Sequence, residues 1–278
     1  MTTQQGVFLF SVDLEDVREN VVNGQQYVDR VVENTELYLN WLDKHNSKCT
    51  FFVVGLIAER YPQLIQKIID KGHEIACHSY NHTPVTRLGK DGFAKDLDKN
   101  LEALHKAGAK DITGFRAPTF SLTQDTQWAY EVLTSKGFTY SSSVLPAKSP
   151  LFGWEGFGNH ARKMNDTIVE LPMTLGRIPP LTIPIGGGVY FRVLPKMFLY
   201  PKIKNALNSG SPLLSYIHPY DADTKQEYFT HEHMTNPFFN WLMYYNRKNL
   251  FNRLDDVMKM GCKIMTYKEY INQDGVSF

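Results

Sequence analysis

Short apolar, β-rich runs alternate with amphipathic, helix-like segments along the first half of the chain. Residues 7–13 form the first apolar run, and residues 28–45 follow with apolar side chains at helical spacing. The same order recurs at residues 48–55 and 58–71. Such β-α units repeat about every 25–35 residues, as in barrels and doubly wound sheets. The sequence therefore predicts an α/β fold with parallel strands and helices outside them.

The regular alternation loosens after Pro146. Residues 171–191 hold four prolines and a run of three glycines, and residues 238–260 then have the pattern of one long helix. We find no linker, low-complexity segment or internal repeat. The chain is therefore predicted to be a single domain over residues 1–278, with an elaborated C-terminal half over about 146–278.

Composition excludes several classes of function. The 278 residues are 42% hydrophobic and 21% charged, which is ordinary for a globular protein. The net charge of +1 gives no electrostatic reason to expect nucleic acid as a partner. No apolar run is long enough to span a bilayer, and no basic residue precedes an apolar segment at the N-terminus. These features, with an odd number of cysteines, predict a cytoplasmic protein without a transmembrane segment, and peripheral association with the inner membrane stays open.

Three carboxylates lie together where the first predicted strand ends. They are Asp13, Glu15 and Asp16. Barrels and open α/β sheets place catalytic groups at the carboxyl ends of their strands. Mutual repulsion in such a cluster is relieved by a cation or a shared proton. The alternative is a solvated acidic turn that caps the next helix.

Two histidines, His78 and His82, follow the third predicted strand. Two imidazoles four residues apart can bind one metal ion if the segment turns helical. Such a pair also arises by chance, so it is weak evidence alone. Two histidines and one carboxylate with open positions would form a hydrolytic metal site.

Arg116 and His218 occupy the ends of two further predicted strands. A buried arginine could orient a carboxylate base through paired hydrogen bonds. A histidine could act as the general acid for a leaving amine. The alternatives are an arginine in a surface turn and a half-buried histidine without a chemical role.

Taken in order, these strand ends resemble NodB-type polysaccharide deacetylases, carbohydrate esterase family four. The segments TFFVVG at 50–55 and GHEIACHSYNH at 72–82 are very close to the second strand and metal motif of that family. The resemblance narrows to deacetylases associated with bacterial exopolysaccharide and exosortase gene clusters, and it runs over about residues 7–255. The narrower resemblance rests on VDLED at 12–16, GFRAPTFS at 114–121, GGVYFRVLP at 187–195 and IHPYD at 217–221.

The resemblance implies a distorted (β/α)₇ barrel and a divalent metal, most often Zn²⁺. It implies hydrolysis of an N-acetyl group on an amino sugar, with an N-acetylated sugar or oligosaccharide of bacterial surface polysaccharide as substrate. Asp13 matches the general base of the family, and His78 and His82 match its metal ligands. Arg116 matches the residue that orients the base, and His218 matches the general acid.

The sequence departs from the family pattern at two points. Members usually have adjacent aspartates, whereas Leu14 here separates Asp13 from Glu15. Asp13 and Glu15 project from the same face of an extended strand. Glu15 is therefore the predicted carboxylate ligand, with Asp16 as the alternative. The relatives also often have an aspartate at position 141, where this chain has serine, so Asp221 is a candidate partner for His218.

Two rival functions stay open from the sequence. One is a cyclic-amide hydrolase of the allantoinase-like kind on the same fold, and the other is a non-catalytic glycan-binding relative. His231 and His233 could add metal ligands, although a solvated loop is the simpler interpretation of that segment.

Overall fold

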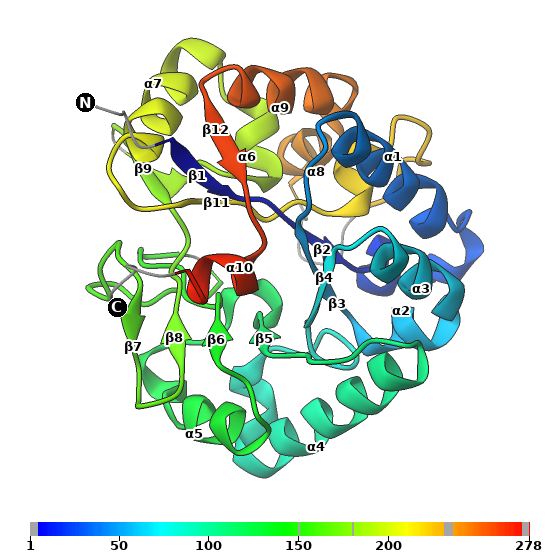
Figure 1. Cartoon of the computed structure of the whole chain (residues 1–278). Coiled ribbons are helices and arrows are strands. Elements are labelled where there is room, and N and C mark those ends of the chain that lie inside the picture. The colour runs from blue at the N-terminus through cyan, green and yellow to red at the C-terminus, as the bar shows by residue number, and fades with distance from the viewer. Residues whose placement is uncertain (1–4, 150, 180, 231–235, 274–277) are drawn as a thin grey trace.

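The first predicted strand is confirmed as a pair of strands, β1 (Gly6–Leu9) and β2 (Ser11–Leu14), separated by Phe10 alone. The computed structural model (Figure 1) describes residues 5–149, 151–179, 181–230, 236–273 and 278. β1 is the centre of a three-stranded parallel sheet, and β2 begins a seven-stranded sheet. The partners of β1 are β11 (Leu213–Leu214) and β12 (Cys262–Ile264).

The larger sheet has the order β2-β3-β4-β5-β6-β8-β7. All of its pairings are parallel except that of β7 with β8. The predicted parallel α/β architecture is therefore confirmed. The remaining bounds are β3 (Thr50–Val53), β4 (Glu74–Cys77), β5 (Gly114–Phe115), β6 (Tyr140–Ser141), β7 (Arg162–Lys163), β8 (Val169–Glu170) and, in a separate antiparallel pair, β9 (Leu175–Ile178) and β10 (Leu181–Pro184).

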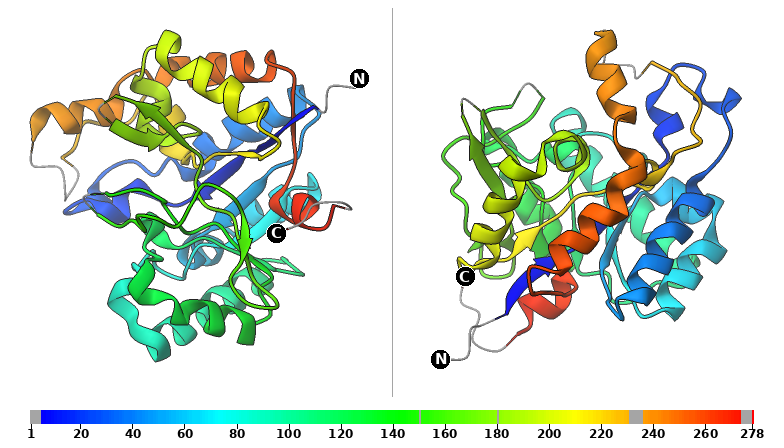
Figure 2. Two further views of the ribbon diagram at one scale, coloured as in Figure 1. Left: turned by 90° about the vertical axis from the view of Figure 1, so that its left-hand side faces the viewer. Right: turned by 90° about the horizontal axis from the view of Figure 1, so that it is seen from above.

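Helices surround the strands on the outside (Figures 1 and 2). None of those in the described part of the chain combines the length and the apolar character needed to cross a bilayer. The bounds are α1 (Val31–Lys44), α2 (Gly55–Arg60), α3 (Pro62–Asp70), α4 (Val85–Lys106), α5 (Trp128–Ser135), α6 (Gly188–Val193), α7 (Lys196–Leu207), α8 (Pro237–Tyr244), α9 (Leu250–Met258) and α10 (Tyr267–Ile271).

Two helices predicted as single elements are each divided. Residues 58–71 fall in α2 and α3, because Pro62 begins a new helix and disfavours helical backbone at the residue before it. Residues 238–260 fall in α8 and α9, because Asn246 adopts a left-handed backbone with φ of 62°. Asparagine adopts this conformation at lower cost than most residues. The helix is therefore broken at Asn246, although the hydrophobic pattern continues on both sides of it.

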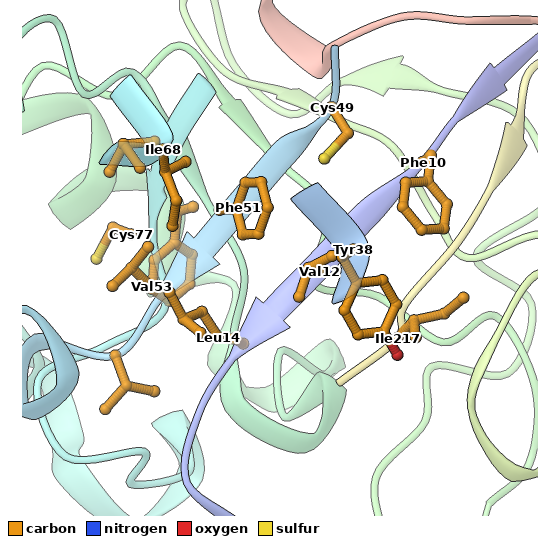
Figure 3. Packing of buried hydrophobic residues seen from close by; sticks show 14 of the residues in the cluster. Phe10, Val12, Leu14, Tyr38, Cys49, Phe51, Val53, Ile68, Cys77 and Ile217 are labelled. Atoms are coloured by element: carbon orange, nitrogen blue, oxygen red, sulfur yellow. The ribbon is translucent and has the colours of Figure 1, made fainter. Parts of the chain in front are cut away.

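Side chains of β2 alternate between two environments. Val12 and Leu14 lie in the largest buried cluster, Val12 beside Tyr38 of α1 and Leu14 beside Val53 of β3 (Figure 3). Ser11 and Asp13 face the other way, and both contact Arg116. Full burial of a valine or leucine side chain contributes about 1.5–3 kcal/mol. A slip of one residue would place carboxylates in this core, so hydrophobic packing fixes which face carries the acids.

A second buried cluster lies inside the ring of strands, on the face that carries the acids. Leu9 of β1 and Ala76 of β4 belong to it, and each is followed along the same strand face by a polar residue. The polar side chains at the strand ends therefore lie directly next to a buried apolar layer that excludes water. Other members of this layer are Phe52, Tyr140, Val169, Leu171, Met173, Leu214, Met265, Tyr267 and Tyr270.

Candidate active site

Asp13 and Arg116 form a buried ion pair at the carboxyl ends of β2 and β5. Arg116 Nη1 lies 2.6 Å from Asp13 Oδ1, and the arginine is fully buried. Asp13 is positioned by backbone pairing on both sides of β2, including a 2.8 Å hydrogen bond from its N–H to Ile217 O. The structure therefore brings together the predicted base and the residue predicted to orient it.

All five N–H groups of the Arg116 guanidinium donate hydrogen bonds. Besides Asp13, the acceptors are Ser11 Oγ at 2.8 Å, Ser142 O and Oγ at 3.1 Å, and Tyr267 Oη at 2.7 Å. The guanidinium carbon also lies 4.0 Å from the ring centroid of Phe52. A buried charge with every donor satisfied is held in one orientation.

Glu15, His78 and His82 form a cluster next to this pair, in which Glu15 and His78 are buried and His82 is partly exposed. One ligand atom from each lies within 4.8 Å of the other two. His82 Nε2 is 2.7 Å from Glu15 Oε2, yet that oxygen accepts no well-oriented hydrogen bond among the described residues. Two imidazoles and one carboxylate that converge in this way are a donor set that can bind a divalent cation.

His78 has the second hydrogen bond typical of metal-binding histidines. Its Nδ1 donates to the backbone carbonyl of Arg116 at 2.8 Å, which leaves the Nε2 lone pair free. Burial lowers the pKa of His78 to about 4, so the ring is neutral at pH 7. Burial alone would raise the pKa of Glu15, but His82, His218 and His78 lower it well below its usual range. Neutral imidazole and ionised carboxylate are the metal-binding forms.

The two histidines meet through a turn and not through a helix. Ser79 and His82 have φ values of 61° and 59°, so the segment 78–82 does not turn helical, and helical spacing is not what brings the two rings together. The ring centroids are nevertheless 5.0 Å apart. The turn is anchored by hydrogen bonds from Tyr80 N to Asp96 Oδ2 at 3.0 Å and from Gly55 N to Ser79 O at 3.0 Å.

Asp16 points away from the histidines. Its carboxylate pairs with Arg18 at 2.6 Å and Arg60 at 3.2 Å, and it accepts the Arg18 backbone N–H at the start of a short 3₁₀ turn. Asp16 therefore caps the following turn, which was the alternative interpretation of the acidic segment. The geometry does not support Asp16 as the alternative metal ligand. Glu15 alone of the two carboxylates reaches the histidine cluster.

His218 completes the group from the end of the strand segment after β11. Its Nδ1 donates to Asp221 Oδ2 at 3.0 Å, and its Nε2 lies 3.6 Å from Glu15 Oε1. Arg192 pairs with the other Asp221 oxygen at 2.8 Å. Burial alone would lower the pKa of His218, but the Asp221 hydrogen bond and the nearby carboxylate charges raise it to about 9.

Sequence reasoning missed several contributors to this site. Tyr267 and Ser142 hold Arg116, and neither stands in a recognisable motif. Tyr220 stacks on His218 with ring centroids 4.7 Å apart and donates to Glu15 Oε1 at 3.2 Å. Ser141, where relatives often carry aspartate, donates to Ser143 Oγ. His231 and His233 lie outside the described residues.

A first test separates the two carboxylates. Glu15→Gln is expected to weaken metal binding by more than about 100-fold, above the usual loss for an outer-shell partner. Asp16→Asn should change it by less than about tenfold, because Asp16 faces two arginines. Metal stoichiometry by mass spectrometry and chelator competition measure both. Weaker metal binding in Asp16→Asn than in Glu15→Gln would transfer the ligand role to Asp16.

A second test concerns the turn that carries the histidines. A Cβ at Gly55 would lie 2.6 Å from the Tyr80 ring and 3.1 Å from its Cα. Gly55→Ala should therefore displace the turn, cost about 1–3 kcal/mol in urea unfolding and weaken metal binding by about 10–100-fold. Gly92→Ala in α4 is the control, since its Cβ would meet Leu88 at 3.5 Å. Equal metal affinity in both variants would contradict this role of Gly55.

Comparison with known proteins identifies relatives of this chain. Residues 24–140 match the polysaccharide deacetylase family, and residues 142–271 match a domain of unknown function, DUF3473. A peptidoglycan-N-acetylglucosamine deacetylase of Bacillus cereus is 25% identical over 185 residues, which are 60% of this chain and 64% of that protein. A peptidoglycan-N-acetylmuramic acid deacetylase of Bacillus subtilis is 36% identical over 85 residues, 30% of this chain and 32% of the other. The chain thus spans less than two thirds of either relative.

Solved structures share the fold. A peptidoglycan N-acetylglucosamine deacetylase superposes with a TM-score of 0.53 at 14% identity, covering 95% of this chain and 86% of that one. A carbohydrate esterase family four pseudoenzyme from Bacillus anthracis gives 0.53 at 13% identity, covering 98% and 67%. The expected distorted barrel of the NodB type is confirmed by this likeness. Over residues 24–140 the chain therefore carries a polysaccharide deacetylase domain, and its fold is of the NodB type.

Proposed function

We propose that this protein is a metal-dependent hydrolase that removes N-acetyl groups from an amino sugar of bacterial surface polysaccharide or its precursor. One observation carries the proposal: a carboxylate paired with a buried arginine, a histidine-histidine-glutamate cluster and a histidine-aspartate pair converge at one end of the strands. Both halves of the chain supply these groups, so we treat residues 1–278 as a single domain.

Glu15, His78 and His82 are the residues that would hold the metal, which we propose to be Zn²⁺. Imidazole and carboxylate donors in this number suit a catalytic zinc site with an open position. When bound, the ion would supply Lewis-acid polarisation of the acetyl carbonyl and a lower pKa for a coordinated water.

Asp13 is proposed to remove a proton from the attacking water. Its carboxylate is held by Arg116, and the Ser11 and Ser142 hydroxyl oxygens accept hydrogen bonds from the guanidinium and keep it in place. The water oxygen forms a bond to the acetyl carbon, and the proton passes to Asp13. Because the base is fixed before the substrate arrives, little reorganisation is needed in the transition state.

His218 is proposed to deliver a proton to the sugar nitrogen as the carbon–nitrogen bond breaks. Its Nδ1 is occupied by Asp221, so Nε2 is the nitrogen that faces the cluster. A pKa of about 9 keeps this ring protonated at neutral pH. The products are acetate and a free amino sugar.

A glycan-binding protein without activity is disfavoured by this set of residues. The pseudoenzyme among the structural neighbours shows that the fold alone does not settle activity. Here the residues proposed as base, metal ligands and acid are all present and lie together. A cyclic-amide hydrolase would share them, and product analysis with N-acetylglucosamine oligomers against cyclic imides separates these two activities.

Variants of the acid test the proposal. His218→Ala should lower kcat by about 10²–10⁴-fold, the usual cost of removing a general acid, with metal content unchanged. Asp221→Asn should lower kcat less, because the imidazole remains but loses its charged partner and its fixed orientation. Acetate release gives kcat, and mass spectrometry gives metal content. A fully active His218→Ala enzyme would show that another group delivers the proton.

A further inference from the structure

Helix α8 exposes a row of aromatic side chains that no described part of the protein covers. Phe238, Trp241 and Tyr245 follow one another at helical spacing, and their rings lie in sequence along one side. Phe239 lies beside them. The exposed fractions are 59% for Phe238, 55% for Phe239, 47% for Trp241 and 43% for Tyr245. We call these four residues the aromatic rim.

The aromatic rim stands on the side of the molecule where the candidate active site opens. In both views of Figure 2, α8 (orange) projects beyond the body of the protein in the direction in which β1 and β2 run. The site residues follow the carboxyl ends of those strands and their neighbours. The rim would therefore be first to meet any surface that the site approaches.

The C-terminal end of α8 is held by hydrogen bonds, and the helix carries no charged side chain. Arg192 donates to the carbonyls of Met243 and Tyr245, and Asn246 donates back to Arg192 O at 2.6 Å. Residues 236–246 contain no charged side chain. The rim is thus a rigid apolar projection and not a solvated charged helix.

The exposed area is too small for a stable dimer. Aromatic side chains bury about 150–250 Å² each, so four half-exposed rings offer on the order of 400 Å². A standard protein interface buries about 800 Å² on each partner. A sugar chain is also a poor fit, because the rim has no carboxylate or cationic side chain, and the amide of Asn236 is used to cap the helix.

We propose that the aromatic rim docks the protein on a lipid bilayer, with α8 entering the interfacial layer and the active site facing the membrane. Tryptophan and tyrosine favour the membrane–water interface, where an apolar ring body and a polar edge are both accommodated. No described helix could span the bilayer, so the association is peripheral. Because residues 236–246 are uncharged, the binding rests on apolar insertion rather than on anionic lipid.

Co-sedimentation of the full chain with phosphatidylcholine vesicles tests this proposal. The wild type should bind, and added phosphatidylglycerol or high salt should change binding little. Phe238→Ala/Trp241→Ala should lower the partition coefficient by at least about tenfold. Phe198→Ala on α7 is the matched control, since this ring is half exposed but α7 lies apart from α8 (Figures 1 and 2), and it should bind like the wild type.

A second measurement does not depend on the folding of a variant. Brominated lipids should quench the fluorescence of exposed Trp241 in the wild type, and Trp241→Phe should remove the quenched signal. Of the other tryptophans, Trp41 and Trp154 are buried, and Trp128 is partly buried on α5, which lies far from α8 (Figure 1). The proposal is overturned if wild-type protein stays off neutral vesicles or needs anionic lipid. It is equally overturned if light scattering shows a dimer that the double variant abolishes, or if titration shows the rim binding an oligosaccharide in place of lipid.

Discussion

Replacing Asp13 with asparagine is expected to lower kcat by about 10²–10⁴-fold, the range found when a general base is removed. The amide cannot accept a proton from water, yet it has nearly the shape of the carboxylate. Four of the five Arg116 hydrogen bonds do not involve Asp13, so the arginine should stay in place. Acetate release from an N-acetylated oligosaccharide gives the rate.

The interpretation depends on metal content and fold being unchanged. Asp13 is outside the Glu15, His78 and His82 cluster, so bound metal should match the wild type. Circular dichroism should show an intact fold. If Asp13→Asn keeps its metal and its full rate, then Asp13 is not the base and the role passes to another group.

Arg116→Met is expected to destabilise the protein by about 3–5 kcal/mol, because the variant leaves the Asp13 carboxylate buried without its charged partner. Methionine has a similar length and fits an apolar position above Phe52. The free energy of unfolding in urea measures the loss. The double variant Asp13→Asn/Arg116→Met should recover part of the stability, because it removes both charges.

Comparison of the two single variants with the double variant separates the effect of charge pairing from that of the other Arg116 hydrogen bonds. If the double variant is as unstable as Arg116→Met, then lost hydrogen bonds to Ser142 and Tyr267 account for the effect and charge pairing does not. Near-equal stability of Arg116→Met and wild type would contradict the buried-pair description altogether.

The sequence predicted the succession of parallel strands, and it singled out the side chains that meet at their ends, wherever local pattern and chemistry coincide. Alternation along β2 placed Asp13 and Glu15 on one face, and the structure confirms that face. A helical turn was only one way in which His78 and His82 could meet, and the structure uses another, in which left-handed backbone at Ser79 and His82 brings the rings together. Hydrophobic spacing contains no information about such single-residue turns.

Contributors from distant parts of the chain could not be predicted in the same way. Tyr267 reaches Arg116 from a helix more than a hundred residues later in the chain, and no motif marks it. The break between α8 and α9 was also missed, since its apolar residues continue on both sides of Asn246. Tertiary contacts, not local propensity, decide these features.

The match to the polysaccharide deacetylase family begins after Asp13 and Glu15 and ends before His218. Three site residues lie inside that match: His78 and His82 of the proposed metal cluster, and Arg116, which orients the proposed base. The proposed base, carboxylate ligand and acid therefore depend on the N-terminal strand and on the region that matches DUF3473. In this proposal the C-terminal half of the chain supplies part of the active site. The same half contains α8.

Acetate release by the purified full chain, before and after metal removal, tests the central proposal most directly. The assay uses N-acetylglucosamine oligomers, with Asp13→Asn as the inactive control. We expect one acetate for each free amine formed, loss of activity after chelation and its recovery on adding Zn²⁺. Acetate release that is unaffected by chelation would contradict the metal-dependent mechanism. Stoichiometric metal without any acetate release from a panel of N-acetylated glycans would contradict the proposed deacetylase activity.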